Sequence, residues 1–188
     1  MNNADKDFEL VKKVKAGCEK SFEDIVNIYK HPILNIIYRY TSNYDDAEDI
    51  AQEVFVKVWK NIKSFKGKSK FSTWLYRITV NHCLNYVNKH KKDPISFERV
   101  VGKGRISDSP NSEITYEKKT KSEIIGKALS NLPDRQKIAL ILSKFEYKSY
   151  SEISYIMGVS ISSVESLIFR AKVNLKKELL PLREKGEI

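Results

Sequence analysis

The sequence is poor in the residues that build metal centres, disulfide frameworks and low-complexity segments. Its 188 residues include only two cysteines, three histidines, seven glycines and five prolines. Cys18 and Cys83 stand alone and have no histidine at a metal-ligand spacing, so we expect no metal site and a reducing, cytoplasmic compartment in which both thiols act as small core residues. The low content of glycine and proline excludes a fibrous or low-complexity chain.

Long apolar runs are also missing. No segment approaches the roughly 20 apolar residues of a membrane-spanning helix, and the N-terminal sequence MNNADKDFELVKKVK lacks the apolar stretch of a secretory signal. We therefore expect a cytoplasmic protein with no membrane insertion. The hydrophobic fraction of 41% is enough for a globular core, and the length suits one mid-sized domain or two small ones.

Charge is abundant and is separated by sign along the chain. The net charge of +10 indicates a polyanionic partner, with nucleic acid preferred over an anionic membrane. Between Lys57 and Lys92 there are ten lysines and arginines and no acidic residue, whereas the segment from Tyr44 to Glu53 holds five acids and no base. Two neighbouring segments of opposite sign predict two different partners.

Apolar periodicity predicts an all-α protein with two small helical domains joined by a flexible linker. We place the first domain at residues 6–92, the linker at 93–113 and a C-terminal helix–turn–helix domain at 114–183, because residues 93–111 lose periodicity and gather proline, glycine and serine. In the first domain we expect helices at 8–16, 21–29, 33–41, about 45–62 and about 72–91, with Ser21 as the cap of the second and Pro32 in the first turn of the third. In the second part of the chain we expect helices at 114–129 and 135–144, separated by a Leu132-Pro133-Asp134 turn and cap. Two short helices around Gly158 follow.

The acidic segment forms one face of its predicted helix. At 100° per residue, Asp46, Asp49 and Glu53 lie on the side opposite the apolar stripe, with Gln52 beside them. Such a face can be merely solvated, and carboxylates at this spacing can also share a hard cation. The third interpretation is a docking face for a protein partner, to which Val56 and Trp59 add apolar contact.

The basic segment combines lysines with aromatic and amide side chains. Its loop, from Phe65 to Phe71, carries Lys66, Lys68 and Lys70. The helix that follows aligns Arg77, Asn81, Asn85, Asn88 and Lys92 in one polar stripe. Lysine neutralises phosphate, aromatic rings stack on bases and asparagine reads base edges, so this pattern favours single-stranded nucleic acid and a pocket for a flipped base. The alternative is that Phe71 and Trp74 are core residues and the lysines a soluble surface.

The segment from Ser149 to Lys177 has the pattern of a helix–turn–helix, with an ordinary αα-corner as the alternative. Ser154 is small where the two helices meet, Gly158 permits a left-handed turn, and Ser160 can cap the second helix. The apolar positions of that helix leave these residues facing outward: Ser162, Glu165, Ser166, Phe169, Arg170, Lys172, Val173 and Lys176. In a DNA-binding motif they would enter the major groove or meet its phosphates.

Together these segments resemble a known family. The stretch from Asp46 to Val87, DAEDIAQEVFVKVWKNIKSFKGKSKFSTWLYRITVNHCLNYV, is similar to region 2 of the extracytoplasmic-function (ECF) sigma factors, which are bacterial RNA polymerase initiation factors. The stretch from Leu129 to Leu179 is similar to region 4 of the same family. The two regions occur in the family's order with a linker between them.

The resemblance implies a sigma factor that directs core RNA polymerase to promoter DNA. Asp49, Gln52 and Glu53 match positions that dock on the coiled coil of the largest polymerase subunit, with region 4 meeting the flap. Phe65, Ile78 and Asn81 match positions around a flipped base of the melted −10 element, and Trp74 and Arg77 belong to the matching block WLYRI. Ser166, Phe169 and Arg170 match contacts to the −35 duplex, and Lys172 is placed for a phosphate. An anti-sigma factor is also expected.

Some positions depart from the family pattern. Glu165 and Leu167 stand where relatives often carry cations, so the resemblance does not determine which −35 sequence this chain would recognise. A two-domain helix–turn–helix regulator that never docks on polymerase is the alternative function. We expect no enzymatic activity and no cofactor, because His82 and His90 have no acidic partner nearby in the sequence.

Overall fold

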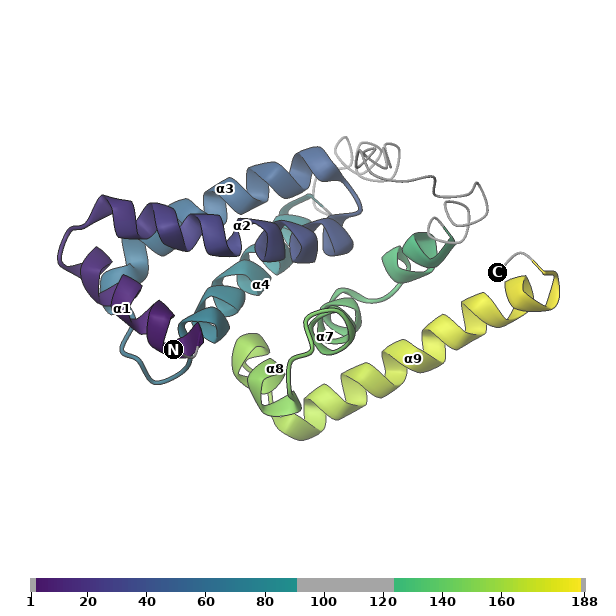
Figure 1. The fold of residues 1–188 in the computed structure, drawn as a ribbon. Helices are drawn as coiled ribbons and strands as arrows, with labels where there is room; N and C mark the ends of the chain where they lie inside the picture. The colour runs from purple at the N-terminus through teal and green to yellow at the C-terminus, as the bar shows by residue number, and fades with distance from the viewer. Residues whose placement is uncertain (1–2, 91–123, 187–188) are drawn as a thin grey trace.

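The computed structural model describes residues 3–90 and 124–186 of the chain (Figure 1). Every regular element among these residues is a helix, which confirms the all-α prediction. The first unit contains α1 (Asn3–Lys15), α2 (Glu19–Thr41), α3 (Tyr44–Asn61), the 3-10 helix η1 (Ile62–Ser64) and α4 (Phe71–His90). The second unit contains a helical stretch at 124–130, then α7 (Asp134–Lys144), α8 (Tyr150–Met157) and α9 (Ile161–Glu184). The expected linker, residues 93–113, lies entirely outside the described residues.

Helix α2 corrects two predictions about the N-terminal unit. The helices expected at 21–29 and 33–41 are one continuous helix with Pro32 inside it. Proline removes one backbone donor from the helix, but Ile25, Ile33 and Ile36 are fully buried along the same face, and this packing outweighs the missing hydrogen bond. Ser21 is not the cap, because Cys18 occupies that position and Ser21 is buried inside the first turn.

Local capping chemistry explains the other helix boundaries. The Asn43 side chain accepts hydrogen bonds from the backbone N–H groups of Asp45 and Asp46, which starts α3 as expected. At α7 the prediction is off by one residue: Pro133 takes the cap position, with no side-chain hydrogen bond, and the helix begins at Asp134.

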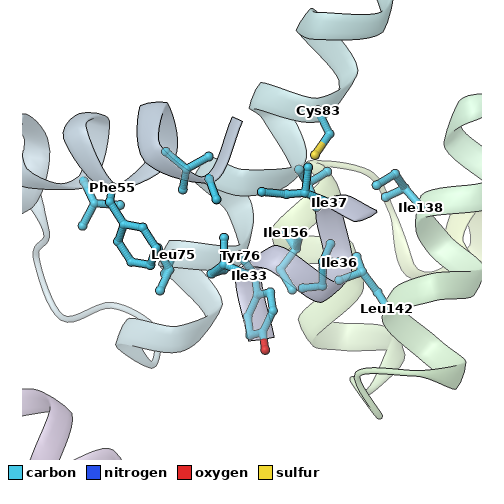
Figure 2. Close-up of a cluster of buried hydrophobic side chains, with 14 of the residues drawn as sticks. Ile33, Ile36, Ile37, Phe55, Leu75, Tyr76, Cys83, Ile138, Leu142 and Ile156 are labelled. Carbon is cyan, nitrogen blue, oxygen red and sulfur yellow. The ribbon is translucent and has the colours of Figure 1, made fainter. Parts of the chain in front are cut away.

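The hydrophobic core is continuous between the two units. Figure 2 shows Ile36 and Ile37 of α2 together with Ile138 and Leu142 of α7, and all four side chains are fully buried. A smaller cluster lies between α7 and α9, formed by Leu129, Leu132, Leu140 and Ala171.

The two cysteines differ in their surroundings. Cys83 of α4 belongs to the shared core, as expected, and burial raises the pKa of its thiol to about 12, so it stays protonated and unreactive at neutral pH. Cys18 is exposed, so its predicted role as a core residue is wrong.

Gly158 joins α8 to α9 and is the glycine whose conformation the motif requires. Its φ is 65°, where a side chain is strained, although no atom lies within 4 Å of an added Cβ. We expect Gly158→Ala to lower the free energy of unfolding by about 1 kcal/mol and the melting temperature by about 3 °C. Gly126 lies in the helical stretch 124–130, also with free space around it. Gly126→Ala is the control, and thermal denaturation should show no loss for it, or a gain of up to about 1 kcal/mol.

Candidate docking and nucleic-acid surfaces

The acidic face of α3 is exposed, as the helical pattern predicts. The opposite side of the helix is buried in the core through Ala47, Ile50 and Val54, which turns Asp49, Gln52 and Glu53 toward solvent. The Glu53 carboxylate also reaches α4, where its Oε2 lies 2.6 Å from Nε2 of His82. The face therefore carries negative charge on a rigid helix rather than on a loop.

Two large apolar side chains extend this acidic face. Val56 is 52% exposed and Trp59 is 40% exposed. The Trp59 ring packs edge-to-face against Phe22 of α2, with 4.8 Å between the ring centroids. A half-exposed tryptophan held by a neighbouring ring, beside several carboxylates, has the composition of a protein-interface hot spot rather than of a solvated helix.

The carboxylates of this face all influence the hydroxyl group of Tyr86. Burial and the nearby Asp46, Asp49 and Glu53 raise the pKa of the Tyr86 hydroxyl to about 12, with burial the larger cause. Among the described residues, no group of three or more His, Cys, Asp or Glu side chains could hold a metal ion. The acidic face therefore has no set of ligands for a metal cation within the described part of the chain.

The basic face lies on α4 and on the loop before it. Arg77, Asn81 and Asn85 are exposed along one side of α4, Ile78 is half-buried beside them, and Lys66, Lys68 and Lys70 are exposed on the loop. Gly67 gives the loop its turn, with a φ of 69°. Lys57 of α3, Leu84 of α4 and the first turn of α7 line a hollow beside Asn81 and Asn85.

Phe65 does not share this exposure. Its side chain is only 6% exposed and packs against Phe71 and Trp74, with ring-centroid distances of 5.7 Å and 5.3 Å. The Lys15 ammonium also donates a hydrogen bond to the Phe65 carbonyl. In this structure the three rings form a cluster that supports the lysine loop from below, and Phe65 presents no free face for stacking.

The C-terminal unit contains the predicted helix–turn–helix. The Ser149 side chain and Glu152 form a reciprocal capping box at the start of α8, and Ser160 caps α9. The chain bends by 99° between the two helices, within the range typical of this motif. The Ser154 hydroxyl donates to the Val159 carbonyl at 2.5 Å, so the small residue at the helix contact also closes the turn.

Helix α9 presents the expected side chains to solvent. Val164, Ile168 and Ala171 are buried, and the outward positions are all exposed, namely Ser162, Glu165, Ser166, Phe169, Arg170, Lys172, Val173 and Lys176. Phe169 is 68% exposed, a large unpartnered ring for a surface helix. Arg135 of α7 lies in the same hollow as Ser162, Ser166 and Arg170. The sequence analysis did not identify Arg135 as a candidate functional residue, although the sequence shows a cation in the first turn of α7.

Comparison with known proteins places both units in one family. The Sigma-70 region 2 model matches residues 12–93, and the Sigma-70 region 4 model matches residues 122–175. The ECF RNA polymerase sigma factor SigW of Bacillus subtilis is 34% identical over 179 residues, covering 92% of this chain and 96% of SigW. The chain belongs to the ECF sigma factors of the sigma-70 family. This sigma factor is also 32% identical to the RNA polymerase sigma-H factor of Pseudomonas aeruginosa, over 97% of this chain and 98% of that protein.

Solved structures agree with this sigma factor in fold. The sigma factor RpoE of Bartonella quintana, in complex with the anti-sigma factor NepR, is 24% identical with a TM-score of 0.68, covering 85% of this chain and 97% of that one. CnrH, in complex with the cytosolic domain of CnrY, is 20% identical with a TM-score of 0.68, covering 93% and 97%. At these identities the likeness concerns the fold alone.

Family membership gives the general role of this sigma factor, which is transcription initiation with RNA polymerase. No single helix in the described part of the chain is long and apolar enough to cross a membrane, although α8 and α9 pass that length and composition test as a bent pair.

Proposed function

We propose that this sigma factor uses three separate surfaces to start transcription. The acidic face of α3 docks on the core polymerase coiled coil, α9 reads the −35 element as duplex, and the basic face of α4 captures the melted −10 element. The observation that carries the proposal is the presence on one chain of an acidic, tryptophan-bearing face and two exposed cationic faces. A regulator that binds only duplex DNA would have no use for the acidic, tryptophan-bearing face.

The mechanism needs no covalent chemistry. Docking through Asp49, Gln52, Glu53 and Trp59 tethers the sigma factor to core enzyme, and α9 then holds the complex on duplex DNA. When the −10 element opens thermally, Arg77, Ile78 and Asn81 contact the exposed bases while the loop lysines neutralise the strand. A few base contacts worth ~1–3 kcal/mol each offset the few kcal/mol of unpairing, so opening follows from preferential binding to the single strand.

The structure modifies the part assigned to Phe65. Because its ring is buried against Phe71 and Trp74, we assign it to holding the Lys66–Lys70 loop in place, with base contact left to the exposed side chains of α4. One structural neighbour is the sigma factor RpoE bound to the anti-sigma factor NepR, and another, CnrH, is bound to the cytosolic domain of CnrY. We expect this chain to have an anti-sigma partner as well.

Run-off transcription tests the proposal directly. The purified chain, mixed with core polymerase from the same organism, should confer initiation at a discrete set of genomic promoters, whose start sites are then mapped. Failure to initiate on any genomic template would remove the sigma-factor mechanism. Retained duplex binding without co-elution with core enzyme would favour the regulator alternative.

Asn81 tests the single-strand step. Its amide lies exposed on α4 beside Asn85, placed to donate to and accept from a base edge. We expect Asn81→Ala to weaken capture of the melted −10 strand by about 1.5 kcal/mol, roughly tenfold, with little effect on duplex binding. Permanganate footprinting measures the opened bases and gel shift measures duplex binding.

The matched control for that experiment is Asn27→Ala, which makes the same change at an exposed position of α2. It should leave both measurements unchanged. Equal losses in footprinting and gel shift for Asn81→Ala would contradict a specific role in trapping unpaired bases.

A further inference from the structure

Helix α1 lies against both ends of the Lys66–Lys70 loop, which carries exposed lysines of the −10 surface. It packs on η1, which ends just before the loop, and on α4, which begins just after it (Figure 1). The three proposed surfaces of this sigma factor leave α1 without a role. Its contacts with the two ends of the loop connect it to the capture of the melted strand.

The loop has few hydrogen bonds of its own. At one end the Phe65 N–H donates to the Ile62 carbonyl, and at the other the Lys70 carbonyl accepts from the Trp74 N–H. Between these ends, within the described part of the chain, no residue from Lys66 to Ser69 makes a backbone–backbone hydrogen bond. A segment with so few internal bonds has little stability of its own, so its path depends on what holds its two ends.

Lys15, the last residue of α1, holds the first end of the loop. Its ammonium donates a hydrogen bond to the Phe65 carbonyl and lies 5.8 Å from the centroid of the Phe65 ring, within the range of a cation–π contact. That carbonyl belongs to the peptide bond between Phe65 and Lys66, so the ammonium orients the first peptide plane of the loop. Hydrogen bonds from charged donors are stronger than those between neutral groups.

A buried hydrogen bond from α1 supports the other end of the loop. Asp7 is only 7% exposed, and its Oδ2 accepts from the Tyr29 hydroxyl of α2 at 2.5 Å. The Tyr29 ring packs edge-to-face against Phe71, the first residue of α4, with 5.8 Å between the ring centroids. Helix α1 therefore holds Phe65 directly and Phe71 through Tyr29.

Lys15 differs in its contacts from the other lysines at the end of α1. Lys12 and Lys13 are also exposed, but neither side chain donates a hydrogen bond to another described residue. Lysines on a helix surface usually remain solvated, and these two fit that description. Lys15 instead reaches across to a backbone carbonyl 50 residues further along the chain.

We propose that Lys15 is a positioning residue for capture of the −10 strand: by holding the Phe65 carbonyl, it keeps the lysines of the Lys66–Lys70 loop where the opened strand meets α4. The inference rests on the proposed function of that loop. Lys15 acts on the strand only through the loop, because its own ammonium is engaged with Phe65. A loop that starts from a fixed peptide plane loses less conformational freedom when the strand binds, and this preorganisation adds to affinity.

Limited proteolysis tests the positioning step without polymerase or DNA. Trypsin needs an extended segment, so cleavage after Lys66 or Lys68 requires the loop to leave its folded path, and its rate reports how firmly the loop is held. Lys15→Met should raise that rate about tenfold, as expected for the loss of one charge-assisted hydrogen bond. Lys15→Arg keeps a cationic donor near the carbonyl and should restore a rate within about twofold of the unmodified chain.

Lys13→Met is the matched control, because it removes the same charge two residues earlier on α1. At 100° per residue, Lys13 points about 160° away from Lys15, and it is exposed. Cleavage of the loop in this variant should match that of the unmodified chain. Equal cleavage rates for Lys15→Met and Lys13→Met would overturn the proposal.

Promoter opening tests whether the held loop captures the strand. With core polymerase and a promoter mapped by run-off transcription, permanganate footprinting should show that Lys15→Met weakens capture of the −10 strand about fivefold, a smaller loss than at Asn81 because Lys15 acts through the loop. Lys15→Arg and Lys13→Met should stay near the unmodified level. Fluorescence anisotropy should show that all three variants keep their affinity for core enzyme, which a general loss of folding would lower.

A loosened loop with unchanged promoter opening would overturn the proposal, and so would a loss of opening that Lys15→Arg does not restore. If the unmodified chain fails to initiate on any template, the proposed function fails and this inference fails with it. A failed comparison of the variants on a working promoter counts against Lys15 alone, so the two failures are distinguishable.

Discussion

Charge reversal at Asp49 should strongly weaken polymerase docking while leaving the sigma factor folded. The Asp49 carboxylate is exposed in the middle of the acidic face, near Glu53 and on the same side of α3 as the apolar Val56. Losing one charge of a close interfacial pair and gaining a repulsion should weaken the complex by about 3 kcal/mol, roughly 150-fold. Titration of labelled Asp49→Arg with core polymerase, followed by fluorescence anisotropy, gives the dissociation constant.

Asp24→Arg is the matched control because it makes the same aspartate-to-arginine change at an exposed position of α2, outside the docking residues of α3. At 100° per residue, Asp24 points well away from Phe22, the α2 residue that packs against Trp59. Its affinity for core enzyme should change by less than about threefold, as expected for a charge outside the contact. If both variants lose affinity equally, the effect is one of net charge and α3 is not the docking face.

The parts of this site that sequence could predict are those governed by local rules. The Asn43 cap, the apolar stripe of α3 and the glycine between α8 and α9 each require only neighbours within about one turn, and all three are present as expected. Because those rules also determine which residues face outward, the exposed positions of α3 and α9 followed from them.

The errors arise where tertiary packing decides the outcome. Pro32 is a reasonable helix start in isolation, but its apolar neighbours are buried along one continuous face, so α2 passes through it. Phe65 shows the same limit, since an aromatic residue among lysines has the same sequence signature whether its ring is exposed or packed. The sequence pattern shows which residue types are suited to burial, but tertiary packing decides whether each side chain is buried and against which partner.

The contact between the two units could not be predicted from the sequence either, because it also depends on tertiary packing. Tyr76 and Glu146, or Tyr40 and Lys137, are far apart in the chain and carry no local signal of pairing. Hydrophobic residues on α2, α7 and α8 are equally consistent with two separate cores. The shared core was visible only once the helices were placed in space.

Charge reversal at Arg170 should remove recognition of the −35 element. The side chain is exposed on α9 and shares a hollow with Ser162, Ser166 and Arg135, so a base edge or phosphate in the major groove can meet all four. Loss of one arginine contact costs ~1–3 kcal/mol, and the new carboxylate adds repulsion from the duplex, so we expect a total of about 3 kcal/mol, roughly 150-fold. Gel shift with a duplex of a mapped promoter measures this loss.

Arg183→Glu separates that contact from the general attraction of a cationic chain for DNA. Arg183 is exposed near the end of the same helix, about 20 Å along its axis from Arg170, and its reversal changes the net charge by the same amount. Arg170→Glu should lose discrimination between promoter duplex and a scrambled duplex, whereas Arg183→Glu should weaken both slightly and keep their ratio. Equal ratios for the two variants would mean that α9 binds only by charge, and that the −35 element is read elsewhere.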